Sequence, residues 1–273
     1  MTSKWFTDPD KLKSSQYATE KNLSARIYVH KKYSTNPIDY PIWIFDRMLE
    51  DFPQDATIIE FGCGNALIWT SNTHRIPDGW KITLTDLSQG MLDNAKQNLG
   101  AFADRFDFKV VDIQDAPFED NQADAVMANF MLYHVPDRVK AIGELRRILK
   151  SDGVLHSVTL GPNHMLEHLQ LIEKAIPHYE WRNDALPFRA DNAVEELGKY
   201  FKMIDNIPYE DNLRITEVEP IVEYLASTAR IENITPDELA KFRSLVEEII
   251  AEKGEFYVQK EVVLFKSTGY ALL

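Results

Sequence analysis

The sequence predicts an α/β fold built on a mostly parallel sheet. Five short apolar segments, rich in β-branched residues, alternate with helical segments between residues 57 and 160, and their connections are short. A glycine turn, Gly62-Cys63-Gly64, separates the first strand from the helix that follows it. Short strand-helix-strand connections favour parallel strands with right-handed crossovers, so these units should form one sheet with helices on both faces.

The first part of the chain is expected to supply this sheet. A helix over residues 38–50 has apolar residues at helical spacing and begins near Pro41, a residue favoured in a first helical turn. Apolar runs that end at turn residues predict strands over residues 58–61, 81–85, 106–111, 123–128 and 154–160. The intervening helices are expected over residues 66–73, 88–98 and 138–150.

The second part of the chain departs from this alternation. Helices are expected over residues 164–175, 192–200, 218–228 and 236–252, and strand-like segments over residues 201–208, 213–216 and 256–265. The helix at 236–252 starts with a proline and has Asp237 and Glu238 in its first turn, where the helix dipole favours acids. A chain of 273 residues has room for one α/β core with an added cap.

Composition excludes several classes of function. The net charge of −13 repels a phosphate backbone, and no run of Lys or Arg is long enough to form a basic groove, so nucleic acid is not expected as a partner. No long apolar run and no signal-like N-terminus occur, so we expect no membrane association and a cytoplasmic location. Cys63 is the only cysteine, which excludes disulfides within the chain and cysteine metal clusters.

The glycine turn after the first strand predicts a cofactor site. Glycines let backbone N–H groups approach a ligand closely, and a helix N-terminus favours negative charge. However, Leu67 occupies the place of the third glycine in the dinucleotide fingerprint, which disfavours a pyrophosphate. Glu60 would also repel a phosphate, whereas it can hold a cationic or hydroxyl-bearing ligand.

These residues resemble a known family. The segment E-F-G-C-G-N at residues 60–65 resembles the first motif of class I S-adenosylmethionine (SAM) dependent methyltransferases, with Ala66 in place of the last glycine. The segment A-N-F-M-L-Y-H-V-P-D at residues 128–137 resembles the fourth motif of the UbiE-like methyltransferases, and K-S-D-G at residues 150–153 resembles the turn before their fifth strand. The resemblance covers roughly residues 55–160. It implies a Rossmann-like sheet of seven strands, mostly parallel with the last strand antiparallel, flanked by helices and covered by a helical cap.

The resemblance also implies a domain organisation. We expect an N-terminal arm or lid over residues 1–40 and a methyltransferase domain over residues 41–273, with cap insertions at about 161–200 and 217–252. The arm either covers one end of the sheet or folds over the cofactor. In the second case Tyr28, His30 and Tyr33 would line the site.

Acids at strand ends are the main candidates for holding SAM. The ligand of an open α/β sheet lies outside the carboxyl ends of the strands, so Asp86 is placed to accept both ribose hydroxyls. The alternative is that Asp86 is the N-cap of the next helix, and both roles can hold if Ser88 caps that helix. Asp112 matches the family's adenine-binding acid, or else is a solvated strand end. Asn129 is implied to hold the methionine ammonium through its backbone carbonyl and amide. The expected cofactor-binding residues are Glu60, Gly62, Gly64, Asp86, Leu87, Met91, Asp112, Ile113, Asn129 and Tyr33.

Few catalytic side chains are required, because SAM supplies the methyl group itself. His134 and His164 are candidate general bases, with structural roles as the alternative, and Tyr133 is implied to face the reacting methyl. His164 and His168 have the i, i+4 spacing of a metal pair, but nothing nearby completes such a site, so no metal is expected and both should be solvated or line the cap. Cys63 lies inside the cofactor turn and is not expected to be a nucleophile.

The sequence therefore predicts transfer of a methyl group from SAM to an oxygen, nitrogen or carbon of a small molecule, by a monomer or homodimer. Two alternatives stay open. An NAD-dependent oxidoreductase would share the fold and the ribose-binding acid. A SAM-binding regulatory protein would keep the cofactor residues and lack a competent pocket.

Overall fold

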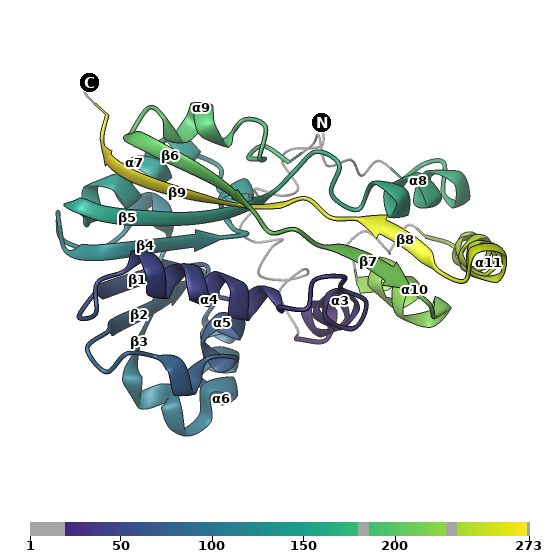
Figure 1. Cartoon of the computed structure of the whole chain (residues 1–273), viewed down its shortest axis with the longest axis horizontal. Coiled ribbons are helices and arrows are strands. Elements are labelled where there is room, and N and C mark those ends of the chain that lie inside the picture. Colours follow the sequence, from purple (N-terminus) through teal and green to yellow (C-terminus); the bar gives the residue numbers. More distant parts are fainter. Residues whose placement is uncertain (1–19, 180–185, 228–233, 272–273) are drawn as a thin grey trace.

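A seven-stranded sheet in the order β3-β2-β1-β4-β5-β9-β6 forms the centre of the computed structural model, which describes residues 20–179, 186–227 and 234–271 (Figure 1). Its strands are β1 (Thr57–Phe61), β2 (Lys81–Asp86), β3 (Phe106–Val110), β4 (Ala123–Asn129), β5 (Leu149–Leu160), β6 (Phe201–Pro208) and β9 (Val262–Tyr270). Strands β1 to β5 are parallel, and β9 is antiparallel to both of its neighbours. The predicted fold class is thereby confirmed.

Two hydrophobic clusters cover the two faces of this sheet. On one face, α4 (Tyr40–Asp51), α5 (Leu67–Thr70) and α6 (Gln89–Leu99) bury residues such as Phe45, Trp69 and Leu92 against β1, β2 and β4. On the other face, α7 (Arg138–Ile148) and α9 (Ala193–Leu197) pack through Leu145 and Leu197. Short 3₁₀ turns lie at η2 (Thr73–Arg75), η3 (Gly100–Arg105), η4 (Ile113–Asp115) and η5 (Leu132–His134).

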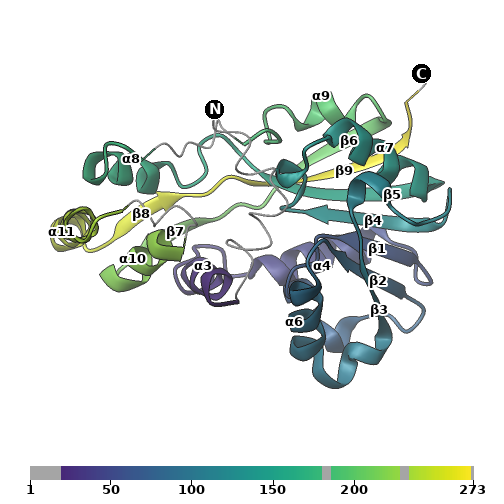
Figure 2. The same cartoon turned by 180° about the vertical axis from the view of Figure 1, so that it is seen from behind.

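A cap with its own hydrophobic cluster extends from one end of the sheet (Figure 2). It consists of α3 (Glu20–Lys32), α8 (Leu166–Ala175), α10 (Val218–Ser227), α11 (Pro236–Lys253) and a two-stranded antiparallel sheet of β7 (Asn212–Ile215) and β8 (Phe256–Gln259). The long α11 begins with a capping box, in which Thr235 and Glu238 satisfy each other's backbone N–H groups. None of the helices in the described ranges has the length and apolar content needed to cross a bilayer.

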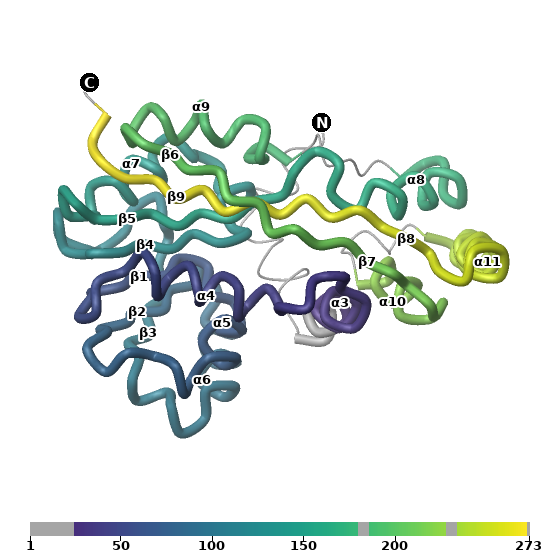
Figure 3. The backbone as a smooth tube through the Cα atoms, in the orientation of Figure 1, coloured from purple at the N-terminus to yellow at the C-terminus, as the bar shows by residue number. Residues whose placement is uncertain are grey.

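Two of the chain segments that join the sheet to the cap run side by side. Strand β6 leads through residues 209–211 into β7, and β8 leads through Lys260 and Glu261 into β9 (Figure 3). The single strand predicted over residues 256–265 is therefore wrong. Its first part pairs with β7 in the cap and its second part pairs with β5 and β6 in the main sheet.

Two further boundaries differ from the prediction. The helix expected to continue to about Thr73 ends at Thr70, because the chain turns there into η2. The predicted cap insertion 161–200 belongs only partly to the cap, since Leu186, Phe188 and α9 are buried in the sheet's own cluster. Of the predicted N-terminal arm, residues 1–19 lie outside the described residues.

Candidate active site

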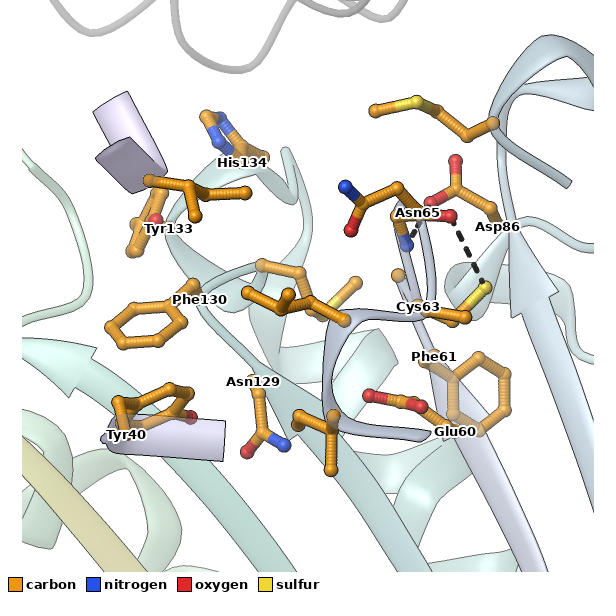
Figure 4. Close-up of a pocket in the computed structure, with 18 of the residues that line it drawn as sticks. Tyr40, Glu60, Phe61, Cys63, Asn65, Asp86, Asn129, Phe130, Tyr133 and His134 are labelled. Atoms are coloured by element: carbon orange, nitrogen blue, oxygen red, sulfur yellow. Dashed lines mark hydrogen bonds between the residues drawn. The ribbon is translucent and has the colours of Figure 1, made fainter. Parts of the chain in front are cut away.

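A cavity of about 500 Å³ opens at the carboxyl edge of the sheet, where Glu60, Asp86 and Asn129 line it (Figure 4). Its lining extends to residues of α3 and of the cap. This volume is within the usual range for a small-molecule site, and its position is the one expected for an open α/β sheet. The predicted site residues that line it are Glu60, Gly62, Gly64, Asp86, Leu87, Met91, Asp112, Ile113, Asn129, Tyr133, His134 and His164. Thus the fold brings together residues from four strand ends and from the start of the cap.

The glycine turn forms the floor of this cavity. Gly62 and Gly64 have φ angles of +69° and +57°, which L residues rarely adopt. A Cβ added at Gly62 would lie 2.9 Å from the Cβ of Met131, whereas one added at Gly64 would meet no atom within 4 Å. Gly64 therefore leaves open space on the side of the cavity. Cys63 is buried, which raises the pKa of its thiol well above the usual range, so it stays protonated as expected for a packing residue.

Asp86 connects the glycine turn to the second strand. One carboxylate oxygen accepts the N–H of Gly64 at 3.1 Å, and the other accepts the N–H of Ser88 at 2.9 Å. The N-cap of α6 is Ser88, whose hydroxyl accepts the backbone N–H of Met91, so Asp86 is not needed as the cap. The contact of Asp86 with a ribose stays a prediction. A carboxylate has about four lone-pair positions, which leaves Asp86 with capacity for a ligand.

Glu60 is buried at the end of β1, with 3% of its surface exposed. Its Oε2 accepts from the indole N–H of Trp69 at 2.5 Å. Burial, together with the nearby Asp86, raises the pKa of Glu60 from 4.5 to about 7, and the indole only partly offsets this. The sequence indicated the acid, but the Trp69 partner depends on the short helix α5 folding back over β1.

Asn129, at the end of β4, has a buried side-chain amide. Within the described part of the chain neither its nitrogen nor its oxygen has a hydrogen-bond partner. Phe130, the next residue, has a φ of +53°, and its N–H donates to Val158 at 2.8 Å, which ends the strand abruptly. A bulky residue in this conformation is strained, and such strain is typical of binding sites. The amide is thereby held toward the cavity with its hydrogen-bonding capacity unused.

Asp112 and Ile113 lie at the cavity rim beyond β3. The carboxylate of Asp112 accepts the N–H and the side-chain amide of Gln114, while Ile113 is buried. Asp112 itself is exposed, so both readings of the sequence, an adenine contact and a solvated strand end, fit this position. Its role in binding a cofactor stays a prediction.

The two predicted bases occupy different environments. His134 is partly exposed and packs edge-on against Tyr133, with ring centroids 4.5 Å apart. In contrast, the Nδ1 of His164 accepts the backbone N–H of Glu261 at 3.2 Å, and burial lowers the pKa of this imidazole to about 3. The neutral ring therefore carries its proton on Nε2 and cannot gain another without losing that bond. This geometry disfavours His164 as a general base and makes it a hydrogen-bond donor.

His168 does not line the cavity but is buried in the cap. Its ring contacts Tyr224 and Phe242 edge-on, at centroid distances of 5.3 and 5.5 Å. Of the two expected environments, solvated or in the cap, His168 therefore has the second, because α8 turns this face toward α11. No group of three or more candidate metal ligands occurs among the residues described.

The arm contributes to the cavity through one face of α3. His30 lines the cavity together with Arg26, whereas Tyr33 is buried in the cap cluster with Val29, and Tyr28 is exposed. Residues 26 and 30, and likewise 29 and 33, are four apart and so share a side of the chain. Tyr28 and Tyr33 therefore do not line the cavity, and the prediction that they do is wrong. The predicted contact between Tyr33 and the cofactor is wrong for the same reason.

Several lining residues were not anticipated from the sequence. These are Tyr40, Phe130, Tyr209, Tyr224 and Lys260. The hydroxyl of Tyr40 is buried with no hydrogen-bond partner among the described residues, and its ring lies 5.2 Å from that of Phe130. For Tyr40, the sequence predicted the helix α4 that carries it, but not that its side chain lines the cavity. The other residues reach the cavity through tertiary contacts that the sequence does not give.

Comparison with known proteins identifies the central part of the chain. Residues 59–157 match a family model described as a methyltransferase domain. A demethylmenaquinone methyltransferase from Clavibacter sepedonicus is 37% identical over 84 residues, which is 31% of this chain and 34% of that protein. A hybrid PKS-NRPS synthetase from Penicillium oxalicum is 25% identical over 143 residues, 50% of this chain and 4% of that protein. The chain thus spans only a small part of the curated relatives it matches.

Solved structures with a similar fold cover most of the chain. A Haemonchus contortus phosphoethanolamine N-methyltransferase, solved with SAM, has a TM-score of 0.58 at 17% identity and covers 97% of this chain and 60% of that one. A [4+2]-cyclase, SpnF, has a TM-score of 0.54 at 16% identity and covers 92% of this chain and 97% of that one. At these identities the likeness concerns the fold.

Proposed function

Because residues 59–157 form a methyltransferase domain of the class I SAM-dependent type, we propose that this chain transfers the methyl group of SAM to a small-molecule acceptor. The observation that carries the proposal is the floor of the cavity. There, the side of Gly64 is open, Glu60 and Asp86 flank the turn, and the amide of Asn129 has no described partner.

The residues of this floor fit SAM. Glu60 and Asn129 would hold the amino-acid part of the cofactor, since an acid suits an ammonium and the amide offers both a donor and an acceptor. Asp86 would accept hydroxyl groups of the ribose, and Leu87, Met91 and Ile113 would enclose the adenine. When bound, SAM supplies an electrophilic methyl group, so the chain's own task is to position the acceptor and, where necessary, accept its proton.

The described geometry disfavours the alternative of a dinucleotide oxidoreductase. Helix α5 has only 4 residues, so it provides little dipole for a pyrophosphate. Leu67 begins this helix at the place of the third glycine, and Glu60 and Asp86 both line the turn. Carboxylates at these positions would repel phosphate oxygens.

Calorimetry with SAM and with S-adenosylhomocysteine tests cofactor binding, and formation of S-adenosylhomocysteine in a mixture of small metabolites tests transfer. We expect heat with both ligands and product only when an acceptor is present. Absence of heat with either ligand would overturn the proposal. Binding without turnover across fractionated cell extracts would favour the regulatory alternative.

The affinity for SAM should depend on pH through Glu60. The folded pKa of about 7 exceeds the ordinary 4.5, so the neutral carboxyl stabilises the fold at low pH. That contribution to the free energy of unfolding, about 3 kcal/mol, is lost as the pH rises through the folded pKa, because Glu60 then carries a buried negative charge. A cationic ligand relieves this charge, so we expect affinity measured by calorimetry to rise roughly tenfold from about pH 5.5 to 7.

Glu60→Gln provides the comparison for this pH effect. Its amide oxygen can still accept from Trp69, but it does not titrate, so the variant should bind SAM more weakly with a flat dependence on pH. An equal slope in the variant and in the original chain would show that another group is responsible.

His134→Ala should lower turnover about 10²- to 10⁴-fold if His134 is the general base, with little change in SAM affinity. The exposed His74 does not line the cavity, so His74→Ala serves as the control in the same assay. Parallel losses of turnover and SAM affinity in His134→Ala would assign His134 a structural role instead.

A further inference from the structure

The charged residues of the cavity are divided between its two ends. Acids lie at the sheet edge, where Glu60, Asp86 and Asp112 stand within two residues of the ends of β1, β2 and β3; a further acid, Asp39, precedes α4. The cationic residues of the described lining come from the cap side: Arg26 and Lys31 on α3, and Lys260 between β8 and β9. One end therefore suits a cation and the other an anion.

We propose that the cap end of this cavity binds an acceptor that carries a carboxylate on an apolar body. This inference rests on the proposed function, which assigns the acidic end to the cofactor. The carboxylate is oriented toward Lys260, and the body of the acceptor lies between this anchor and the glycine turn.

Lys260 is the main support for an anionic ligand. Only 6% of its side chain is exposed, and its ammonium pairs with Asp211, whose side chain is buried as well. The Oδ1 of Asp211 accepts from the hydroxyl of Ser34 at 2.8 Å and from the N–H of Thr35 at 2.9 Å and of Asn36 at 3.1 Å. Asp211 is thereby fixed outside the cavity lining, while Lys260 lies within it. An ammonium has three donor hydrogens, so this ion pair leaves Lys260 with further donors.

The charge of Lys260 reaches the neighbouring histidines. It lowers the pKa of both His30 and His164, and at His164 its effect exceeds the opposing effect of Asp211. The Nε2–H of His164 and the hydroxyl of Tyr224, which lies 3.4 Å from Nε2 of His30, belong to the same end of the cavity. These groups are neutral, so they add no negative charge that would compete with a bound carboxylate.

The space between the two ends is apolar. The ring of Tyr40 lies 5.2 Å from that of Phe130 and 5.8 Å from that of Tyr209, so the three rings form a continuous wall. Leu160 and Val262, on the antiparallel pair β5 and β9, also line this part. Such a surface favours a ring or an alkyl chain over a sugar or a peptide.

The test compares acids with their amides on the protein saturated with S-adenosylhomocysteine. The probes are 4-hydroxybenzoate, 3-phenylpropanoate and octanoate, each paired with its carboxamide, and calorimetry gives the dissociation constants. We expect at least one acid to bind at least tenfold more tightly than its amide. Equal binding of acids and amides, or no binding of any acid while S-adenosylhomocysteine binds, would overturn the inference and leave the proposed function intact. Failure of S-adenosylhomocysteine itself to bind would overturn both.

A paired substitution locates the anion site. The double variant Lys260→Met, Asp211→Asn removes the ammonium without leaving a buried carboxylate unpaired, and should abolish the preference for acids while S-adenosylhomocysteine still binds. Lys260→Arg should retain that preference. The matched control is Lys266→Met, Asp51→Asn, since this pair joins β9 to α4 and does not line the cavity. A preference for acids that survives in the first double variant would exclude Lys260 as the anchor.

Discussion

Gly64→Val is expected to weaken SAM binding at least about 100-fold, because the added side chain occupies the open space where the cofactor would lie. A valine at the φ of +57° is also strained, which should lower the free energy of unfolding by about 1–2 kcal/mol. Calorimetry with SAM measures the first effect, and urea unfolding measures the second.

Gly100→Val separates these two effects. Gly100 has a φ of +54°, and a Cβ there would also meet no atom within 4 Å, but it ends α6 and does not line the cavity. The control should show the loss of stability without the loss of binding. Undiminished SAM affinity in Gly64→Val would place the cofactor elsewhere.

Asp86→Ala is expected to raise the dissociation constant for SAM about 5- to 150-fold, corresponding to about 1–3 kcal/mol for the lost hydrogen bonds to the ribose. Part of this effect would be indirect, because the N–H groups of Gly64 and Ser88 also lose their acceptor. Calorimetry with SAM and with free adenosine locates the effect. Because both ligands contain the ribose, the variant should weaken the binding of both.

Asp107→Ala is the comparison for this variant. Asp107 is an exposed acid on the neighbouring β3 and is not among the lining residues, so its removal changes the net charge equally without touching the cavity. Equal affinities in the two variants would remove Asp86 from the binding site.

The sheet-edge end of the cavity, which the proposed function assigns to the cofactor, was largely predictable because its signals are local. Glu60, Gly62 and Gly64 adjoin one strand in sequence, and Asp86 and Asn129 each end another. In a parallel sheet, such strand ends meet at one edge, so the order of strands along the chain was enough to place these residues together. The unpartnered amide of Asn129 and the raised pKa of Glu60, however, depend on burial, which the sequence does not give.

The cap end of the cavity was not predictable in the same way. Tyr209, Tyr224 and Lys260 come from parts of the chain far from the glycine turn. Tyr209 and Lys260 lie in the segments that join β6 to β7 and β8 to β9, and Tyr224 lies on α10 of the cap. Tyr33, just past the end of α3, was misplaced because proximity in sequence to His30 does not fix which way a side chain points. The role of His164 changed once its Nδ1 was found to accept from Glu261, a contact between residues 97 positions apart.

By itself, the sequence determined the class of fold, the cofactor turn and the strand-end acids, since each follows from a pattern a few residues long. Only the tertiary structure decided which face of α3 lines the cavity, that His164 accepts a hydrogen bond at Nδ1, and how charge is divided between the two ends of the cavity. These properties arise from burial and from long-range pairing, and both depend on the chain having folded.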